Sequence, residues 1–75
     1  MKLYIAECYD RHIDPVIMVF DSPEAAISYA KAFVHDNARH KDDITEELVD
    51  WALFYCRYSG EGDHVLVKEG TLNNQ

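Results

Sequence analysis

Apolar and polar residues alternate along the first part of the chain. In residues 2–9, apolar side chains, many of them aromatic or branched, occupy both the odd and the even positions. This pattern is typical of a β-strand with one or both faces covered. A polar stretch over residues 10–15 follows, and after it comes the wholly apolar run of residues 16–20. This order predicts a hairpin built from residues 2–9 and 16–20.

The clearest local signal for a helix lies just after this hairpin. Ser22 can accept hydrogen bonds from the free amide groups of a first turn, and Pro23 suits the first helical position because it has no amide hydrogen. Apolar residues then recur at spacings of three and four, and Asn37 is a suitable stop residue. The pattern predicts a helix over residues 23–36. Its inward stripe is Ala26, Ile27, Ala30, Phe33 and Val34.

Residues 42–50 hold five acids in nine positions. Asp43 and Glu46 have the spacing of a capping box, although a carboxylate replaces the usual hydroxyl. We therefore expect a short amphipathic helix here. In such a helix an acidic ridge of Asp43, Glu46, Glu47 and Asp50 would lie on one face, and Ile44, Leu48 and Trp51 on another.

A second hairpin is expected in the last third of the chain. Residues 51–58 are rich in aromatic side chains, the Gly-rich turn of residues 59–63 follows, and residues 64–68 have the pattern of a last strand. The alternative is that the acidic helix continues through Ala52 and Tyr55. Together these elements predict one α+β domain over residues 1–70.

The predicted order is strand, strand, helix, short helix, strand, strand. It favours a four-stranded antiparallel sheet (β-β-α-α-β-β) with one long and one short helix packed on a single face. Residues 71–75 are expected to form a flexible tail. Phe33, Trp51 and Phe54 are expected in the core, and Tyr4, Tyr9, Tyr55 and Tyr58 partly exposed where a partner could bind.

Charge narrows the classes of function. Fourteen acids against seven Lys and Arg give a formal net charge of -7. A surface of that sign repels phosphate, which argues against direct binding of nucleic acid and against docking on anionic lipid. Residues 41–50 carry one Lys and five acids, more than half of the net charge. A chain of 75 residues also has a marginal core, so self-association is an alternative that its size alone suggests.

The chain carries no pattern of a membrane span or an export signal. Glu7 interrupts the N-terminal segment too early for a signal-peptide apolar region, and no apolar run approaches the roughly 20 residues of a membrane span. Cys8 and Cys56 are 48 residues apart, a spacing that fits no metal knuckle and no redox motif. We expect a cytoplasmic protein with two reduced, buried, structural cysteines.

Sequence motifs for catalysis are weak. No nucleophile elbow or phosphate-binding loop is present, and residues 60–62 suit a hairpin turn. His35 and His40 are five residues apart, so on a helix their rings would point away from each other. The sequence therefore predicts no enzyme, no cofactor and no metal site. The one ligand-binding alternative is a small site made of His12, Asp14 and His64.

One resemblance rests on the junction between strand and helix. Residues 19–31 run from an apolar strand end through Asp21, Ser22 and Pro23 into a helix. This stretch resembles a pattern in small uncharacterised bacterial and phage proteins of hairpin-helix-hairpin type. In size and charge the chain is also similar to small acidic phage inhibitors of host defence. The resemblance implies no particular functional residue.

The sequence thus predicts a small acidic, non-catalytic protein-interaction module, of the kind that a phage or mobile element encodes to bind a basic surface of a host protein. The alternatives are a structural homodimer, paired through a sheet edge or an open sheet face, and the small ligand binder described above. The predicted partner-binding residues are Asp42, Asp43, Glu46, Glu47, Asp50, Tyr55 and Tyr58.

Overall fold

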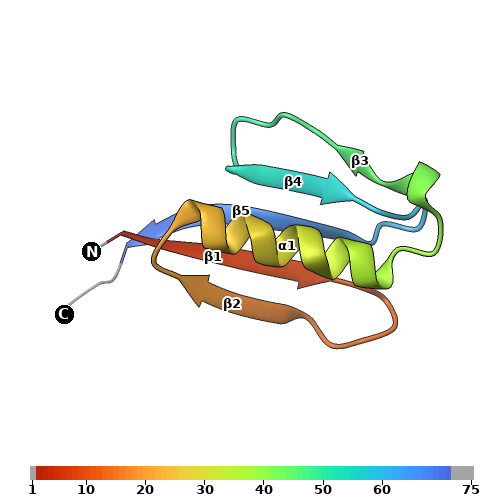
Figure 1. Ribbon diagram of the computed structural model, residues 1–75, viewed down its shortest axis with the longest axis horizontal. Helices are drawn as coiled ribbons and strands as arrows, with labels where there is room; N and C mark the ends of the chain where they lie inside the picture. The colour runs from red at the N-terminus through yellow and green to blue at the C-terminus, as the bar shows by residue number, and fades with distance from the viewer. Residues whose placement is uncertain (1, 72–75) are drawn as a thin grey trace.

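The computed structural model describes residues 2–71 of the chain. Its elements are β1 (Lys2–Tyr9), β2 (Val16–Phe20), α1 (Pro23–Asn37), the short 3-10 turn η1 (Lys41–Asp43), β3 (Thr45–Glu46), β4 (Phe54–Arg57) and β5 (His64–Thr71). The five strands form one antiparallel sheet in the order β2-β1-β5-β4-β3 (Figure 1).

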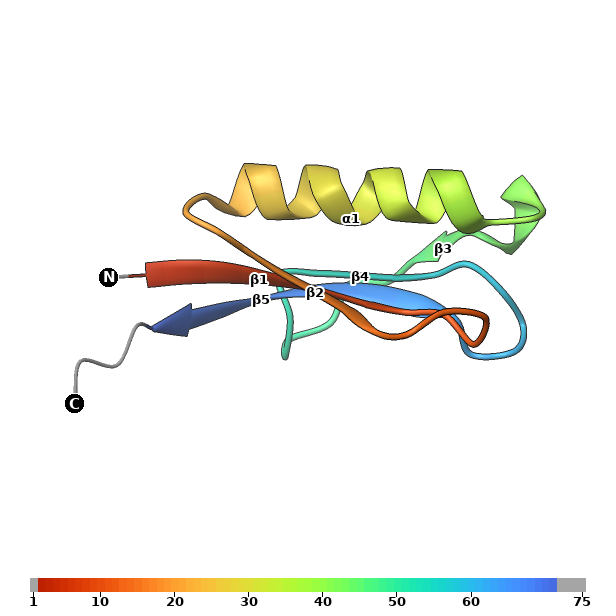
Figure 2. The ribbon, with the colours of Figure 1, turned by 90° about the horizontal axis from the view of Figure 1, so that it is seen from below.

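The helix α1 lies on one face of the sheet, and no element of the described chain covers the other face (Figure 2). The α+β class is confirmed, with helix and sheet as two layers. No helix of the described residues is long and apolar enough to cross a membrane.

The start of α1 follows the local signals. The Ser22 hydroxyl accepts a hydrogen bond from the Ala25 amide at 3.2 Å, and Pro23 occupies the first turn. At the other end, the Asn37 side chain donates to the Phe33 carbonyl at 2.8 Å. The predicted helix over residues 23–36 is therefore confirmed to within one residue.

The core lies between α1 and the sheet. Its fully buried members are Ala26, Ala30 and Val34 of the helix, with Ala6, Cys8, Cys56, Tyr58, Val65 and Val67 below them. Five of these nine side chains are alanine or cysteine, which lets the helix backbone approach the strands closely. Ile27 and Phe33 pack half-buried at the margin, so the predicted inward stripe is confirmed.

The first and last strands, β1 and β5, pair over their whole lengths at the centre of the sheet, from Lys2 opposite Thr71 to Tyr9 opposite His64. The last strand is longer than the predicted residues 64–68. At Gly70, a Cβ atom would stand 2.9 Å from the end of the Ile5 side chain, so a larger residue here would require that side chain to shift. Of the residues predicted to form a flexible tail, Thr71 is paired with Lys2 of β1, and residues 72–75 lie outside the described residues.

The four-stranded sheet with two helices is wrong. Residues 42–50 form no helix: η1 ends at Asp43, and Thr45 and Glu46 then add a fifth strand by pairing with Arg57 and Cys56 of β4. The alternative in which the helix continues through Ala52 and Tyr55 is also wrong, since Phe54–Arg57 is strand β4.

The crowding of acids explains this difference. On a helix, Asp43 and Glu47 would be like charges four residues apart, and so would Glu46 and Asp50, which destabilises an isolated short helix. In the extended chain, Glu46 and Glu47 point to opposite sides of the sheet. The backbone of β3 also pairs with the edge of β4, which would otherwise be left open.

Two aromatic residues lie where the sequence did not place them. Trp51 was expected in the core but is 57% exposed, in the connection between β3 and β4. Tyr58 was expected at the surface but is 2% exposed, with its ring edge-on to that of Phe33. Phe33 and Phe54 pack half-buried against the core, and Tyr4, Tyr9 and Tyr55 are half-buried.

Both cysteines are free and buried, as expected. Cys8 and Cys56 flank Val65 on the same face of the sheet, one on each neighbouring strand. Two strand spacings separate their backbones by about 10 Å, beyond the reach of a disulfide.

Because the core lies on one side of α1 only, an Ala→Asp substitution should affect the free energy of unfolding differently at a buried and at an exposed position of the helix. Ala30→Asp places an unpaired carboxylate against the sheet and should lower the free energy of unfolding by at least about 3 kcal/mol. Ala32→Asp is the matched control, because Ala32 is exposed in the same helix. Urea unfolding followed by circular dichroism measures both. Equal losses for the two variants would contradict the placement of the stripe.

Candidate functional site

The face of the sheet opposite α1 is the largest surface that the fold leaves uncovered, and we call it the open face. The register of the strands assigns its residues, because side chains alternate between the two faces. They are Leu3, Ile5, Glu7 and Tyr9 of β1, Ile17 and Val19 of β2, Tyr55 and Arg57 of β4, and His64, Leu66 and Lys68 of β5.

Four rings form a continuous row along one side of the open face. The ring centroids of Tyr9 and His64 are 5.1 Å apart, those of His64 and Tyr55 are 5.7 Å apart, and those of Tyr55 and Trp51 are 5.1 Å apart. The His64 Nδ1 atom lies 2.8 Å from the Gly62 carbonyl oxygen, a contact that holds the imidazole in place. We call these four side chains the aromatic row.

A buried carboxylate anchors one end of the row. The Tyr9 hydroxyl donates to Glu7, and the Lys68 ammonium lies 2.5 Å from the other oxygen of the same carboxylate. The Glu7 side chain is only 11% exposed, although no helix covers this face. The hydrogen bond from Lys68 and then that from Tyr9 hold the pKa of Glu7 below its ordinary value of 4.5.

The connection between β3 and β4, residues 47–53, borders the open face, and we call it the β3–β4 loop. Figure 2 shows it bending to the side of the sheet away from α1. Leu48 is fully exposed, Trp51 is 57% exposed and Leu53 is 49% exposed. Large apolar side chains exposed together in this way mark interaction surfaces in soluble proteins.

Two shallow hollows lie beside Leu53. One, of about 260 Å³, is bordered by Glu47, Leu48 and Tyr55. The other, of about 350 Å³, is bordered by Trp51 and Lys68. Each is large enough to accept a single side chain of a partner.

The charges of this region fall into two groups. Those within the open face are paired: Glu7 with Lys68, and Arg57 with Glu47 of the loop at 2.7 Å. Asp50 lies beside Trp51 and forms no ion pair among the described residues. The open face is therefore close to neutral, with a negative margin at the loop.

The structure brings only some of the predicted partner-binding residues together. Glu47, Asp50 and Tyr55 lie on or beside the open face. Glu46 points toward the helix side of the sheet because it stands opposite Cys56. Asp42 and Asp43 belong to η1, so the predicted ridge on one helix face does not exist.

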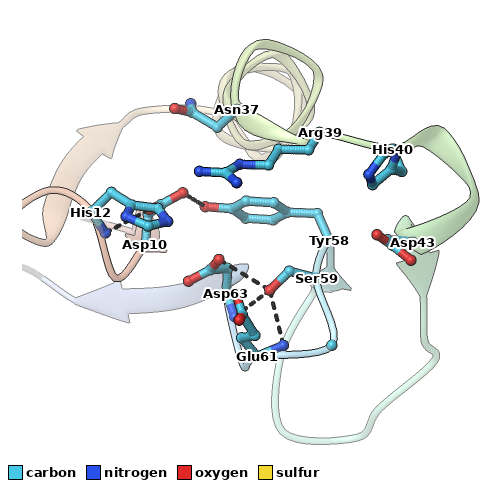
Figure 3. A pocket seen from close by; sticks show the side chains of 11 residues that line it. Asp10, His12, Asn37, Arg39, His40, Asp43, Tyr58, Ser59, Glu61 and Asp63 are labelled. Atoms are coloured by element: carbon cyan, nitrogen blue, oxygen red, sulfur yellow. Dashed lines mark hydrogen bonds between the residues drawn. The ribbon is translucent and has the colours of Figure 1, made fainter.

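Tyr58 is no surface anchor, because it belongs to a polar cluster at the end of the molecule where three connections meet. Figure 3 shows its hydroxyl pointing at Asp10, to which it donates at 2.7 Å. The same carboxylate accepts from the His12 amide at 2.8 Å. The bond from Tyr58, more than that from His12, lowers the pKa of Asp10, and burial raises the pKa of Tyr58.

The second carboxylate of this cluster is that of the buried Asp63. It accepts from the Ser59 hydroxyl at 3.0 Å and from the Arg11 amide at 2.9 Å. These bonds tie the β1–β2 connection to the turn between β4 and β5. A pocket of about 200 Å³ lies above the cluster, with His12, Arg39 and His40 at its rim (Figure 3).

The hydroxyls of this cluster bind carboxylates. Among residues 2–71, Tyr58 donates to Asp10 and Ser59 donates to Asp63, and no hydrogen bond connects an imidazole with either hydroxyl. Burial raises the pKa of Cys8 to about 11 and also raises that of Cys56, which keeps both as thiols at neutral pH.

The residues of the ligand-binding alternative are not assembled. His64 belongs to the aromatic row, while His12 and Asp14 lie exposed in the β1–β2 connection. Within the described part of the chain, no group of three or more His, Cys, Asp or Glu side chains is placed to hold a metal ion.

The sequence did not predict that the aromatic row and the β3–β4 loop form one surface. Trp51 and His64 were not assigned to it, because their neighbours come from distant parts of the chain. The prediction that Tyr9 and Tyr55 are partly exposed was the only signal of this surface in the sequence.

The pairing of Glu7 predicts an acid dependence of stability. Because its pKa is lower in the folded chain than the ordinary 4.5, its contribution is complete above that pH and is lost as the pH falls through the folded value. Glu7→Gln should therefore lose less stability than the wild type between pH 6 and roughly pH 3. Asp14→Asn, an exposed loop change, should behave as wild type. Urea unfolding at each pH measures this, and equal slopes for Glu7→Gln and wild type would refute it.

Comparison of the chain with protein-family models, with curated proteins and with solved structures found no match. The resemblance of residues 19–31 to small bacterial and phage proteins therefore stays a prediction, and the case for function rests on the geometry of the chain itself.

Proposed function

We propose that the protein is a small acidic, non-catalytic interaction module that binds another protein through the open face and the β3–β4 loop. The observation that carries this proposal is the aromatic row, which runs from the sheet to Trp51 beside the fully exposed Leu48. Tyr and Trp are the residues that most often anchor protein interfaces, because they bury a large area at a small cost in side-chain entropy.

The distribution of exposed apolar residues supports this surface. The large apolar side chains of the described chain that are clearly exposed are Ile13, Ile17, Met18, Val19, Leu48, Trp51 and Leu53. Five of the seven belong to the open face or to its loop. Three of these, Leu48, Trp51 and Leu53, lie together in the β3–β4 loop, and large apolar side chains exposed together mark interaction surfaces.

The charges indicate the chemistry of the partner. The β3–β4 loop carries Glu47 and Asp50 and no base, and Glu46 precedes it. The chain as a whole has a net charge of -7. The partner is therefore a protein segment with an apolar centre and Lys or Arg beside it, which the acids attract during the encounter.

The polar cluster and the thiols support a role without catalysis. The carboxylates of Asp10 and Asp63 already accept hydrogen bonds from the chain itself, and both thiols are buried. A cytoplasmic setting suits these two free thiols. Modulation of a host protein by a phage or mobile-element product is the biological role that the resemblance favours.

The β3–β4 loop provides the first test. Immobilised wild-type protein is used to capture a partner, which is identified, purified and titrated against each variant. Leu48→Ala and Trp51→Ala should each raise the dissociation constant at least about tenfold, because the loss of an interface anchor costs about 2 kcal/mol or more of binding free energy. Ile13→Ala is the matched control, because Ile13 is an exposed apolar residue of the β1–β2 connection and does not belong to the β3–β4 loop. Binding that all three variants keep unchanged would refute the proposed surface.

A second arm of the same titration tests the partner's charge. Asp50→Lys should slow association, and added salt should weaken wild-type binding, whereas the dissociation rate should change little. Glu24→Lys, on the exposed first turn of α1, changes the net charge equally and serves as control. An equal effect of the two reversals would show that only the net charge matters and not the loop.

A further inference from the structure

The outer edge of β2 is unprotected. β2 pairs with β1 on one side, and no described strand pairs with its other side. Figure 1 shows β2 at the margin of the sheet, with α1 lying over the neighbouring strands. Alternate backbone amide and carbonyl groups of an edge strand point outward without partners, so such an edge accepts another strand.

β2 contains none of the residue types that usually protect an edge strand from pairing. Val16, Ile17, Met18, Val19 and Phe20 include no charge, no glycine and no proline. Ile17 and Val19 are 51% and 55% exposed on the open face, and Met18 is 41% exposed on the helix side. Apolar side chains are therefore exposed on both faces of the same edge.

The opposite edge of the same sheet differs. β3 has only two paired residues, Thr45 and Glu46, and Glu47 follows directly. A very short edge strand with charged side chains is a common protection against further pairing. An association through β2 would therefore end at two chains and would not continue into a fibre.

We propose that β2 pairs antiparallel with β2 of a second copy of this chain, about a two-fold axis at Met18. This inference does not depend on the proposed function, because it uses the edge of β2 and neither the aromatic row nor the β3–β4 loop. In this register each Met18 faces its equivalent, Ile17 faces Val19, and Val16 faces Phe20. Every cross-strand pair is apolar, so the strand is complementary to itself.

The charges next to the strand allow a second copy. The nearest acids in the sequence are Asp14 and Asp21. The same register places Asp14 opposite Ser22 and Asp21 opposite Pro15, so no like charges stand directly opposite each other. The remaining repulsion comes from the net charge of each chain, and salt screens it. Dimerisation should therefore strengthen as salt rises, whereas binding to the basic partner should weaken.

The dimer would carry one ten-stranded sheet. A two-fold axis perpendicular to the sheet keeps both α1 helices on one side and both open faces on the other. The five residues of β2 are about 17 Å long, so the interface is small and should dissociate on dilution. The result is a bivalent module with one aromatic row on each side of the two central β2 strands.

Charge exchange at the two-fold axis is the decisive experiment. Sedimentation equilibrium should give wild-type chains a mass that rises from 8.7 kDa to twice that value with concentration. Met18→Lys and Met18→Glu should each stay monomeric, because equal charges meet at the axis. An equimolar mixture of the two should restore the dimer through a cross-strand ion pair. Circular dichroism and the melting temperature verify that each variant folds.

Controls separate this proposal from the proposed function. Ile13→Lys adds the same charge outside β2 and should dimerise as wild type. Trp51→Ala should also dimerise, and a Met18→Lys monomer should still bind the basic partner. The proposal is overturned if the wild type stays monomeric at the highest soluble concentration in high salt. It is equally overturned if folded Met18→Lys still dimerises, or if the mixture of the two charged variants stays monomeric.

Discussion

The close packing of α1 on one face of the sheet is the constraint on which the rest of the structure depends. Ala26 and Ala30 meet Ala6, Cys8, Val65 and Val67, and such small side chains bring the helix close to the strands. The described chain has one such helix, and it covers one face only. The other face must combine two roles: it has to be stable in water and it has to expose apolar surface. The ion pair between the buried Glu7 carboxylate and the half-exposed Lys68 serves the first role, and the aromatic row serves the second.

The pairing of β1 with β5 brings the two ends of the chain to the centre of the sheet and leaves the middle of the chain to form its margins. The two margins differ in chemistry. On the side of β3, acids and an apolar loop lie together, which suits a partner that carries both apolar and basic groups. On the side of β2, the strand is uncharged and complementary to itself. The proposed surface for a different protein and the proposed edge for a second copy therefore lie at opposite margins of the sheet, and the acids of residues 41–50 are on the β3 side.

Local signals in the sequence predicted the elements that depend on near neighbours. The first hairpin and the capped helix follow from residues 2–20 and from Ser22 with Pro23, and they are confirmed. The fifth strand was not predictable in this way, because Thr45 and Glu46 become a strand only through pairing with β4. The exposure of Trp51 and the burial of Tyr58 depend on contacts across the fold, with Tyr55 and with Asp10. The acids of residues 42–50 were recognised as a group, but their directions depend on whether the segment is helical or extended.

The fluorescence of Trp51 tests the central claim most directly, because it is the only tryptophan of the chain and ends the aromatic row. In the free protein, the account predicts emission typical of a water-exposed indole, with stronger quenching by caesium than by iodide because of the neighbouring acids. Dimerisation through β2 should leave this emission unchanged, whereas binding of the basic partner should shift it to shorter wavelength and protect it from both ions. An indole already shielded in the dilute free protein, or one that stays equally accessible when the partner is bound, would contradict the account.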